Sequence, residues 1–236
     1  MKKILLLITI LSLFLIQCGN FITSSANNNN NNNNDYTFLK DRKGRYSIET
    51  AVNQTMDIVL FDTGYIQIIM KTTAGNVNSG SYYLGNPGNA ASQYDFTINV
   101  NNMPVTYTMD FQNNTLITSG VSIPMTKVSS STDIQLDERV GMYLNWKNQK
   151  QYVIVSKNSI ALSIGGNNTR IENLSSTSKE ISYSKEIKLS GIEGIIEYTF
   201  VDKGVRVVYK VTDSQLGTVM DLDEVFTILD MQQNNL

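Results

Sequence analysis

Few side chains in this sequence could carry out chemistry, and the most reactive of them is a single thiol. The chain has 236 residues, one cysteine (Cys18) and no histidine. Without histidine, a Ser-His-Asp triad and the usual zinc ligands are excluded. Cys18 directly follows an apolar N-terminal stretch, where a thiol can be acylated. We therefore expect this thiol to serve attachment to lipid rather than catalysis.

The other candidates for catalysis are carboxylates, which could act in pairs as in glycoside hydrolysis. The candidate groups are Asp137-Glu138, Glu193 with Glu197, and Asp221-Asp223-Glu224. Glu193 and Glu197 share one strand face but lie about 13 Å apart in an extended chain, too far for either mechanism. The acidic residues 221–224 lack the spacing of an EF-hand calcium loop. We interpret all of them as solvated surface charge and predict no catalytic residue, no metal site and no cofactor.

One segment, residues 58–64, resembles the aspartic protease signature of apolar residues followed by Asp-Thr-Gly. That chemistry needs two such aspartates sharing a proton, and the sequence has no second copy. Tyr65 also stands where the protease family has a small residue. Asp62-Thr63-Gly64 is itself a favourable hairpin turn, and we interpret it as one.

The N-terminus has the layout of a secretory signal. Two lysines precede an apolar run at 4–16, which is too short to span a membrane. Leu15-Ile16-Gln17-Cys18 resembles the lipobox of bacterial lipoproteins, with Gln17 in place of the usual small residue, as in the looser boxes of spirochaete lipoproteins. The resemblance implies that the signal peptide 1–17 is removed. It also implies that Cys18 carries lipid, including palmitate, and that the protein is anchored in the envelope, at the outer membrane.

Residues 18–35 then form an Asn- and Ser-rich segment with eight consecutive asparagines, 27–34, which we expect to be a tether. A coil of this length reaches roughly 20–25 Å. The whole chain has 19 basic and 21 acidic side chains and no Lys/Arg run. This composition argues against a nucleic-acid partner.

From residue 36 onward the apolar residues alternate with a period of two, which is typical of half-buried strands. Turn residues punctuate these runs at 62–64, 165–168 and 202–204. Strands this short and this regularly spaced predict an all-β fold, an antiparallel meander that closes as a barrel or sandwich. The tail at 222–229 also fits helical spacing, but we favour a closing strand there.

The two halves of the chain share features. Gly44-Arg45-Tyr46 and Gly141-Met142-Tyr143 open them, and Tyr-Thr strands follow at 107–111 and 198–200. We therefore predict two tandem domains of about 95 residues, 36–130 and 131–236, with one larger barrel as the alternative. Each half loosely resembles the small lipocalin-like modules of bacterial lipoproteins.

These patterns predict a membrane-anchored surface or envelope protein that works by contact rather than by catalysis. Its expected partners are membrane lipid, through acylated Cys18, and a small apolar ligand, a glycan or a protein. Large residues dominate the alternating faces, which favours filled barrels over open cavities. A structural or assembly role in the envelope is the alternative, and a hydrolase that uses carboxylates is the remote one.

Overall fold

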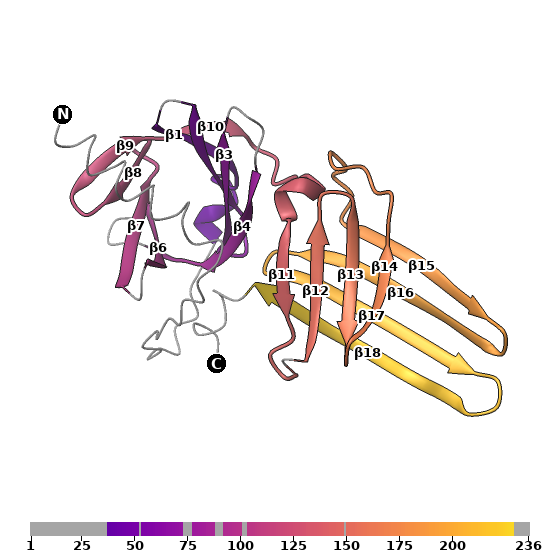
Figure 1. The fold of residues 1–236 in the computed structure, drawn as a ribbon. Helices are drawn as coiled ribbons and strands as arrows, with labels where there is room; N and C mark the ends of the chain where they lie inside the picture. Colours follow the sequence, from indigo (N-terminus) through magenta and orange to yellow (C-terminus); the bar gives the residue numbers. More distant parts are fainter. Residues whose placement is uncertain are drawn as a thin grey trace. The chain divides into compact units, whose positions relative to one another are not determined.

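The computed structural model describes residues 37–51, 53–72, 77–87, 92–100, 103–148 and 150–228 (Figure 1). The expected signal peptide, Cys18 and the expected tether lie outside the described residues, so their roles stay predictions. Across the described ranges, no helix has the length and apolar character needed to cross a membrane. The chain divides into two compact units, whose described residues are 37–132 (unit 1) and 133–228 (unit 2). The all-β antiparallel fold predicted from the sequence is confirmed.

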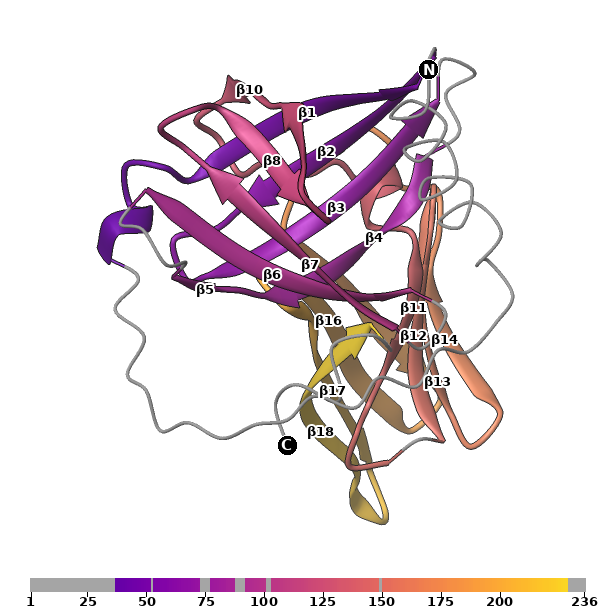
Figure 2. The same cartoon turned by 90° about the vertical axis from the view of Figure 1, so that its left-hand side faces the viewer.

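Unit 1 is an antiparallel meander whose strands lie in two five-stranded sheets, ordered β10-β1-β2-β3-β4 and β5-β6-β7-β8-β9. Figure 1 shows β6–β9 and the strands β1, β3 and β4 as two groups, and Figure 2 shows the same strands from a direction turned by 90°. Only Met125 separates β9 from β10, so one stretch of chain leaves the second sheet and pairs with β1 in the first. The elements are η1 (Thr37–Leu39), β1 (Gly44–Ala51), β2 (Gln54–Leu60), β3 (Tyr65–Thr72), β4 (Val77–Leu84), β5 (Asn86–Pro87), β6 (Gln93–Val100), β7 (Met103–Asp110), β8 (Thr115–Thr118), β9 (Val121–Pro124) and β10 (Thr126–Ser129).

Unit 2 is one eight-stranded antiparallel sheet, ordered β14-β13-β12-β11-β18-β17-β16-β15. Its strands curl into a nearly closed barrel, open only where β14 and β15 are not paired. In Figure 1, β15–β18 are long strands that extend past the shorter β11–β14. The elements are η2 (Leu136–Arg139), β11 (Gly141–Leu144), β12 (Gln151–Ser156), β13 (Ser159–Ile164), β14 (Asn167–Ile171), β15 (Ser182–Leu189), β16 (Ile192–Val201), β17 (Gly204–Asp213) and β18 (Gly217–Ile228).

Both units follow the same plan. Four strands are followed by a break in the pairing, and the last strand of each meander returns to pair with its first. The break lies between β4 and β5 in unit 1 and between β14 and β15 in unit 2. The closing pairs are β10 with β1 and β18 with β11. The described strands therefore form two meanders and not the single larger barrel that was the alternative.

The repetition extends to a sequence motif at the start of each unit. Residues 39–46 and 136–143 share the pattern Leu-x-x-Arg-x-Gly-x-Tyr. In each copy the tyrosine hydroxyl donates a hydrogen bond to the carbonyl oxygen of the arginine four residues earlier, at 2.6 Å for Tyr143. A one-turn 3-10 helix precedes the first strand in both units. The pattern thus forms the same local structure before the first strand of each unit. It is a longer form of the Gly-x-Tyr similarity between the two halves of the sequence.

The arginine of each motif also packs in the same way. The guanidinium of Arg42 lies 5.4 Å from the ring centroid of Phe111, which directly follows β7. In unit 2, Arg139 lies 4.3 Å from the ring centroid of Phe200, near the end of β16. Such cation–π contacts stabilise by roughly 0.5–2 kcal/mol each. They tie the 3-10 turn at the start of each unit to a strand far along its meander.

The turns follow the chemistry that the sequence indicated. Gly165 and Gly166 form a two-residue hairpin loop with φ of 55° and 88°, as a type I′ turn requires. Gly64 closes the β2–β3 turn with φ of 86°. The chain from 217 to 228 is strand β18, so the strand interpretation of the tail is correct and the helical spacing there was misleading. The tail also fits helical spacing because Val225, next to the buried Phe226, is an apolar residue on the other face of β18.

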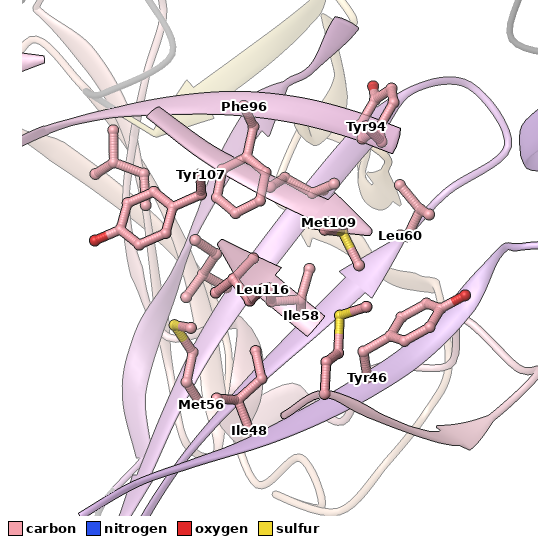
Figure 3. Packing of buried hydrophobic residues seen from close by; sticks show 14 of the residues in the cluster. Tyr46, Ile48, Met56, Ile58, Leu60, Tyr94, Phe96, Tyr107, Met109 and Leu116 are labelled. Carbon is pink, nitrogen blue, oxygen red and sulfur yellow. The ribbon is translucent and has the colours of Figure 1, made fainter. Parts of the chain in front are cut away.

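The interior of unit 1 is built from large apolar and aromatic side chains (Figure 3). The rings of Phe96 and Tyr107, on the paired strands β6 and β7, stack with centroids 5.4 Å apart. Burying such rings is the main source of stability in a chain segment without disulfides. The cluster contains Leu39, Tyr46, Ile48, Met56, Ile58, Leu60, Ile66, Ile68, Met70, Tyr94, Phe96, Ile98, Tyr107, Met109, Leu116 and Met125.

One of the buried polar groups of unit 1 that have no hydrogen bond gives a testable prediction. The hydroxyl of Tyr107 is buried with no partner, and burial raises its pKa to about 12. Because an unpaired buried hydroxyl costs roughly 1–3 kcal/mol, we expect Tyr107→Phe to leave unit 1 as stable or about 1 kcal/mol more stable. Calorimetric unfolding of the wild-type protein and of the variant measures this difference in stability. A clear loss of stability would instead show that the hydroxyl has a bound partner.

The same tyrosine predicts how stability depends on alkaline pH. Its pKa in the folded protein is raised above the value of about 10 in an unfolded chain, so the unfolded state loses the proton first. The raised pKa of Tyr107 therefore contributes to the free energy of unfolding below pH 10, and this contribution is lost as the pH rises from about 10 to about 12. We expect the free energy of unfolding to fall less steeply in that window for Tyr107→Phe. Denaturant titrations at several pH values test it, and identical slopes would contradict it.

Candidate functional site

The Asp-Thr-Gly segment forms a turn in the structure. Asp62 lies between β2 and β3, and its carboxylate pairs with Lys43 Nζ at 2.8 Å. The hydrogen bond from Lys43 holds the pKa of Asp62 below its usual value. A protease dyad needs one carboxyl that keeps its proton, which requires a raised pKa. Asp62 therefore has the environment of a surface turn residue.

The other carboxylates serve structural contacts or face solvent. Glu138 is buried in η2 and accepts a hydrogen bond from the backbone N–H of Gln135 at 3.0 Å, as a helix cap. Asp137 is its neighbour in the same turn. Glu193 and Glu197 both lie exposed on the outer face of β16. The structure thus brings neither pair together as a catalytic couple.

The acidic residues of β18 are separated by the alternation of the strand. Asp223 faces outward and forms a bidentate pair with Arg206 at 2.6–2.7 Å, which lowers the pKa of the carboxyl. Asp221 lies on the same face opposite Lys210. Glu224 points the other way and binds Lys147 Nζ at 2.9 Å. Among the described residues, no group of three or more His, Cys, Asp or Glu side chains could hold a metal ion.

The feature that has no structural explanation is an apolar surface on unit 2. The outer side of β11 and β12 carries five large side chains, named here the contact face: Met142, Leu144, Trp146, Tyr152 and Ile154. Strand register brings them together, since Met142 pairs with Ile154 and Leu144 with Tyr152. Met142 is 52% exposed and Ile154 is 38% exposed. Exposed apolar residues gathered in this way mark interaction surfaces.

The inner side of the same strands explains why these residues must face outward. Tyr143, Val153 and Val155 alternate with them and are fully buried in the barrel. Because side chains alternate across a strand, a buried Tyr143 fixes Met142 and Leu144 on the opposite face. The outward position of the contact face is therefore a consequence of the core.

Trp146 belongs to this outer surface. Its indole N–H donates a hydrogen bond to the hydroxyl of Thr227, which pairs with Leu144 in the register of β11 and β18. The side chain is half-buried. The nearby Tyr143, by contrast, is fully buried in the core.

The contact face continues onto small residues of the next strand. Ala161 pairs with Ile154, and Ser163 pairs with Tyr152, so both lie on the same outer side of the sheet. They are only 5% and 2% exposed. On the next strand, β14, Arg170 pairs with Ala161 and Asn168 pairs with Ser163.

The charges around the contact face have one sign. Between Glu138 and Glu172 the sequence contains no acidic residue. The strands β11–β14 and their connections carry only cations, namely Lys147, Lys150, Lys157 and Arg170. All four are exposed. Two of these cations form ion pairs with acidic residues outside the segment: Lys147 with Glu224, and Arg170 with Glu172 at 3.3 Å.

The opposite half of the barrel has the reverse balance. From 182 to 228, the strands β15–β18 and their turns carry eight acidic and five basic side chains. Unit 2 is therefore electrically polarised, with its apolar surface on the cationic side. The acidic residues are Glu186, Glu193, Glu197, Asp202, Asp213, Asp221, Asp223 and Glu224, and the basic ones are Lys185, Lys188, Lys203, Arg206 and Lys210.

The corresponding face of unit 1 is different. Superposing the two motifs places Arg45 where unit 2 has Met142, and Asp57 where it has Tyr152. Asp57 is nearly buried and accepts ion pairs from Arg45 at 3.1 Å and from Lys71 at 3.0 Å. The equivalent surface of unit 1 thus neutralises its own charges, and the exposed apolar, cationic surface is specific to unit 2.

The chain matches no protein-family model, no curated protein and no solved structure. By its fold, the protein belongs to the all-β class and consists of two antiparallel meanders with the same strand arrangement. The contact face was missed from the sequence, although two signals of it were present. One is the run without acidic residues from 139 to 171, and the other is the large residues on both phases of the alternation at 142–146 and 151–155.

Proposed function

We propose that this protein is an exported lipoprotein, anchored to the bacterial envelope through acylated Cys18, and that it acts as a non-enzymatic interaction module. The outer membrane is the proposed location. The anchor is supported by the order of a basic start, an apolar run and Cys18 in the sequence. The single observation that carries the interaction role is the contact face, a group of exposed and half-buried apolar side chains on one side of the sheet.

Contact is favoured over catalysis because the reactive groups are engaged elsewhere. Glu138 caps a turn, and Asp62 and Asp223 pair with cations. The described interior of unit 1 is built from large side chains, which favours the outer surface as the place of binding. An envelope assembly role would use the same surface and differs only in the partner.

The mature N-terminus tests the anchor. The protein is produced in a bacterium with a lipoprotein-processing pathway, extracted from membranes and analysed by intact mass and by mass of its N-terminal peptide. We expect the chain to begin at Cys18 and to carry a diacylglyceryl group and an amide-linked acyl chain. The matched control, Cys18→Ser, is expected to lack these masses and to leave the membrane fraction. A free α-amine on any residue after Cys18 in the wild-type chain would contradict the proposal.

A further inference from the structure

We propose that the contact face of unit 2 docks on the surface of an anionic lipid bilayer. This inference rests on the proposed function, because the anchor at Cys18 would hold the protein beside such a surface. It goes further by naming the partner of the contact face and the orientation of unit 2, with β11–β14 toward the lipid and β15–β18 away from it.

The charge distribution is the first reason. The segment 139–171, which includes the strands of the contact face, has no acidic side chain and carries the exposed cations Lys147, Lys150, Lys157 and Arg170. Anionic headgroups attract lysine and arginine near the membrane surface. Five of the eight acidic side chains between 182 and 228 lie on β15–β17 and their turns. The other three lie on β18, which pairs with β11, and two of them, Asp223 and Glu224, are paired with Arg206 and Lys147.

The chemistry of the side chains is the second reason. The contact face combines one tryptophan and one tyrosine with Met142, Leu144 and Ile154. Tryptophan and tyrosine favour the boundary between headgroups and acyl chains, because their rings are apolar while their N–H and O–H groups stay hydrated. Exposed aliphatic residues between them add apolar area that lipid would cover. A surface of aromatic and aliphatic residues in a cationic segment has the composition of an interfacial membrane-binding surface.

These features also distinguish lipid from a nucleic acid or another soluble polyanion. Such a partner would be held by a dense cluster of cations that contact its charged groups. Here Met142 and Ile154 are exposed apolar neighbours, and two of the four cations are already paired with glutamates. An apolar surface gains from contact with acyl chains and gains nothing from a phosphate backbone.

The equivalent face of unit 1 serves as an internal comparison. There, Arg45 and Lys71 are both paired with Asp57, and the apolar residues of unit 2 have no counterpart at Arg45 and Asp57. The two units share one plan, so this difference is confined to side chains on the outer surface. The docking surface is thus a property of unit 2 alone. Even a low affinity of the contact face for lipid is enough for docking, because an anchored protein stays beside the membrane at a high effective concentration.

The test uses Trp146, the only tryptophan of the chain and a member of the contact face. The acylated full-length mature protein is reconstituted into vesicles of phosphatidylcholine, or of phosphatidylcholine with phosphatidylglycerol, each with brominated acyl chains that quench nearby tryptophan. We expect several-fold stronger quenching of Trp146 on the anionic vesicles and a loss of this difference at high salt. Equal, weak quenching on both vesicles would overturn the proposal.

Two pairs of variants locate the docking surface. Ile154→Asp is expected to remove most of the quenching, whereas Leu216→Asp, at an apolar residue on the β17–β18 turn that is even more exposed, is expected to leave it unchanged. Lys150→Glu with Lys157→Glu is expected to weaken it, and Lys203→Glu with Lys210→Glu, on the opposite half, is not. Fluorescence and circular dichroism without lipid confirm that each variant is folded. The reverse pattern in either pair would overturn the proposal.

The outcomes separate docking from anchoring. Protein that stays with the vesicles while Trp146 is not quenched overturns docking and leaves the proposed function intact. If Cys18 is found without lipid, the proposed function fails, and titration of the same protein with brominated anionic vesicles still decides whether the contact face binds lipid. A response to anionic vesicles without quenching by acyl-chain bromine would mean binding by charge alone, which also overturns the proposal.

Discussion

Unit 2 of the Gly204→Val protein is expected to unfold at a much lower urea concentration than the wild-type unit. Gly204 begins β17, where the carbonyl oxygen of Phe226 in β18 would lie only 2.1 Å from an added Cβ atom. The Phe226 oxygen belongs to the backbone of β18, and Gly204 pairs with that strand. Relieving the clash would therefore require β17 and β18 to move apart. We expect a loss of at least about 3 kcal/mol in the free energy of unfolding.

The single tryptophan makes this loss measurable for unit 2 alone. Trp146 lies in unit 2, so its fluorescence in urea follows the unfolding of that unit. The matched control is Gly166→Ala, because Gly166 has φ of 88° but no atom within 4 Å of an added Cβ. The control should cost only about 1–2 kcal/mol, from the positive φ. Equal losses in the two variants would show that the approach of Phe226 is not what requires a glycine at Gly204.

Tyr198→Ala is expected to have an effect of similar size for a different reason. Tyr198 is fully buried on β16, and its hydroxyl donates a hydrogen bond to the carbonyl oxygen of Thr169 on β14 at 3.0 Å. This bond crosses the position where β14 and β15 are not paired, so Tyr198 holds the open side of the barrel together. Removing the ring leaves a cavity and should cost about 3–5 kcal/mol.

Tyr198→Phe separates the bond from the ring. It keeps the ring but leaves the Thr169 carbonyl without this donor, which should cost about 1 kcal/mol. Urea unfolding followed by Trp146 fluorescence measures both variants. If Tyr198→Phe were as damaging as Tyr198→Ala, the hydrogen bond rather than packing would close the barrel, and the account of the core of unit 2 would have to change.

The sequence predicted the strands well because alternation directly reports burial on one face. Val153 and Val155 are buried and Ile154 is exposed, as a half-buried strand requires. The turns were predictable for a similar reason, since Gly165 and Gly166 adopt the positive φ that only glycine accepts readily. The exception is the tail, where helical and strand spacing coincide over a few residues and only the pairing with β17 and β11 decides.

The contact face could not be predicted because it depends on long-range register. Alternation says that Met142 and Ile154 each point away from the core, but not that they are neighbours. That follows from the pairing of β11 with β12. Trp146 joins them through Thr227, which is 81 residues away in the chain. A single apolar residue on the solvent-facing side of a strand is common and indicates nothing about function. Several such residues side by side indicate an interaction surface.

The arginine of the repeated motif was missed for the same reason. Arg42 and Arg139 look like surface charges in the sequence, yet Arg139 is 5% exposed. The aromatic rings that they contact, Phe111 directly after β7 and Phe200 on β16, lie far along the chain. The repeat of residues 39–46 at 136–143 is visible in the sequence, but the reason for its arginine appears only in three dimensions.

Hydroxyl-radical footprinting of the vesicle-anchored protein is the most direct test of the central claim, that this protein works by contact through one face of unit 2. Side-chain oxidation is compared between protein on anionic vesicles and the same protein in detergent, and read by mass spectrometry. We expect Met142, Trp146 and Ile154 to be protected several-fold on the vesicles. Leu189 and Leu216, which are 67% and 79% exposed on the long hairpins, are expected to remain as reactive as before. Protection of Leu189 and Leu216 with unchanged oxidation of the contact face would contradict the account.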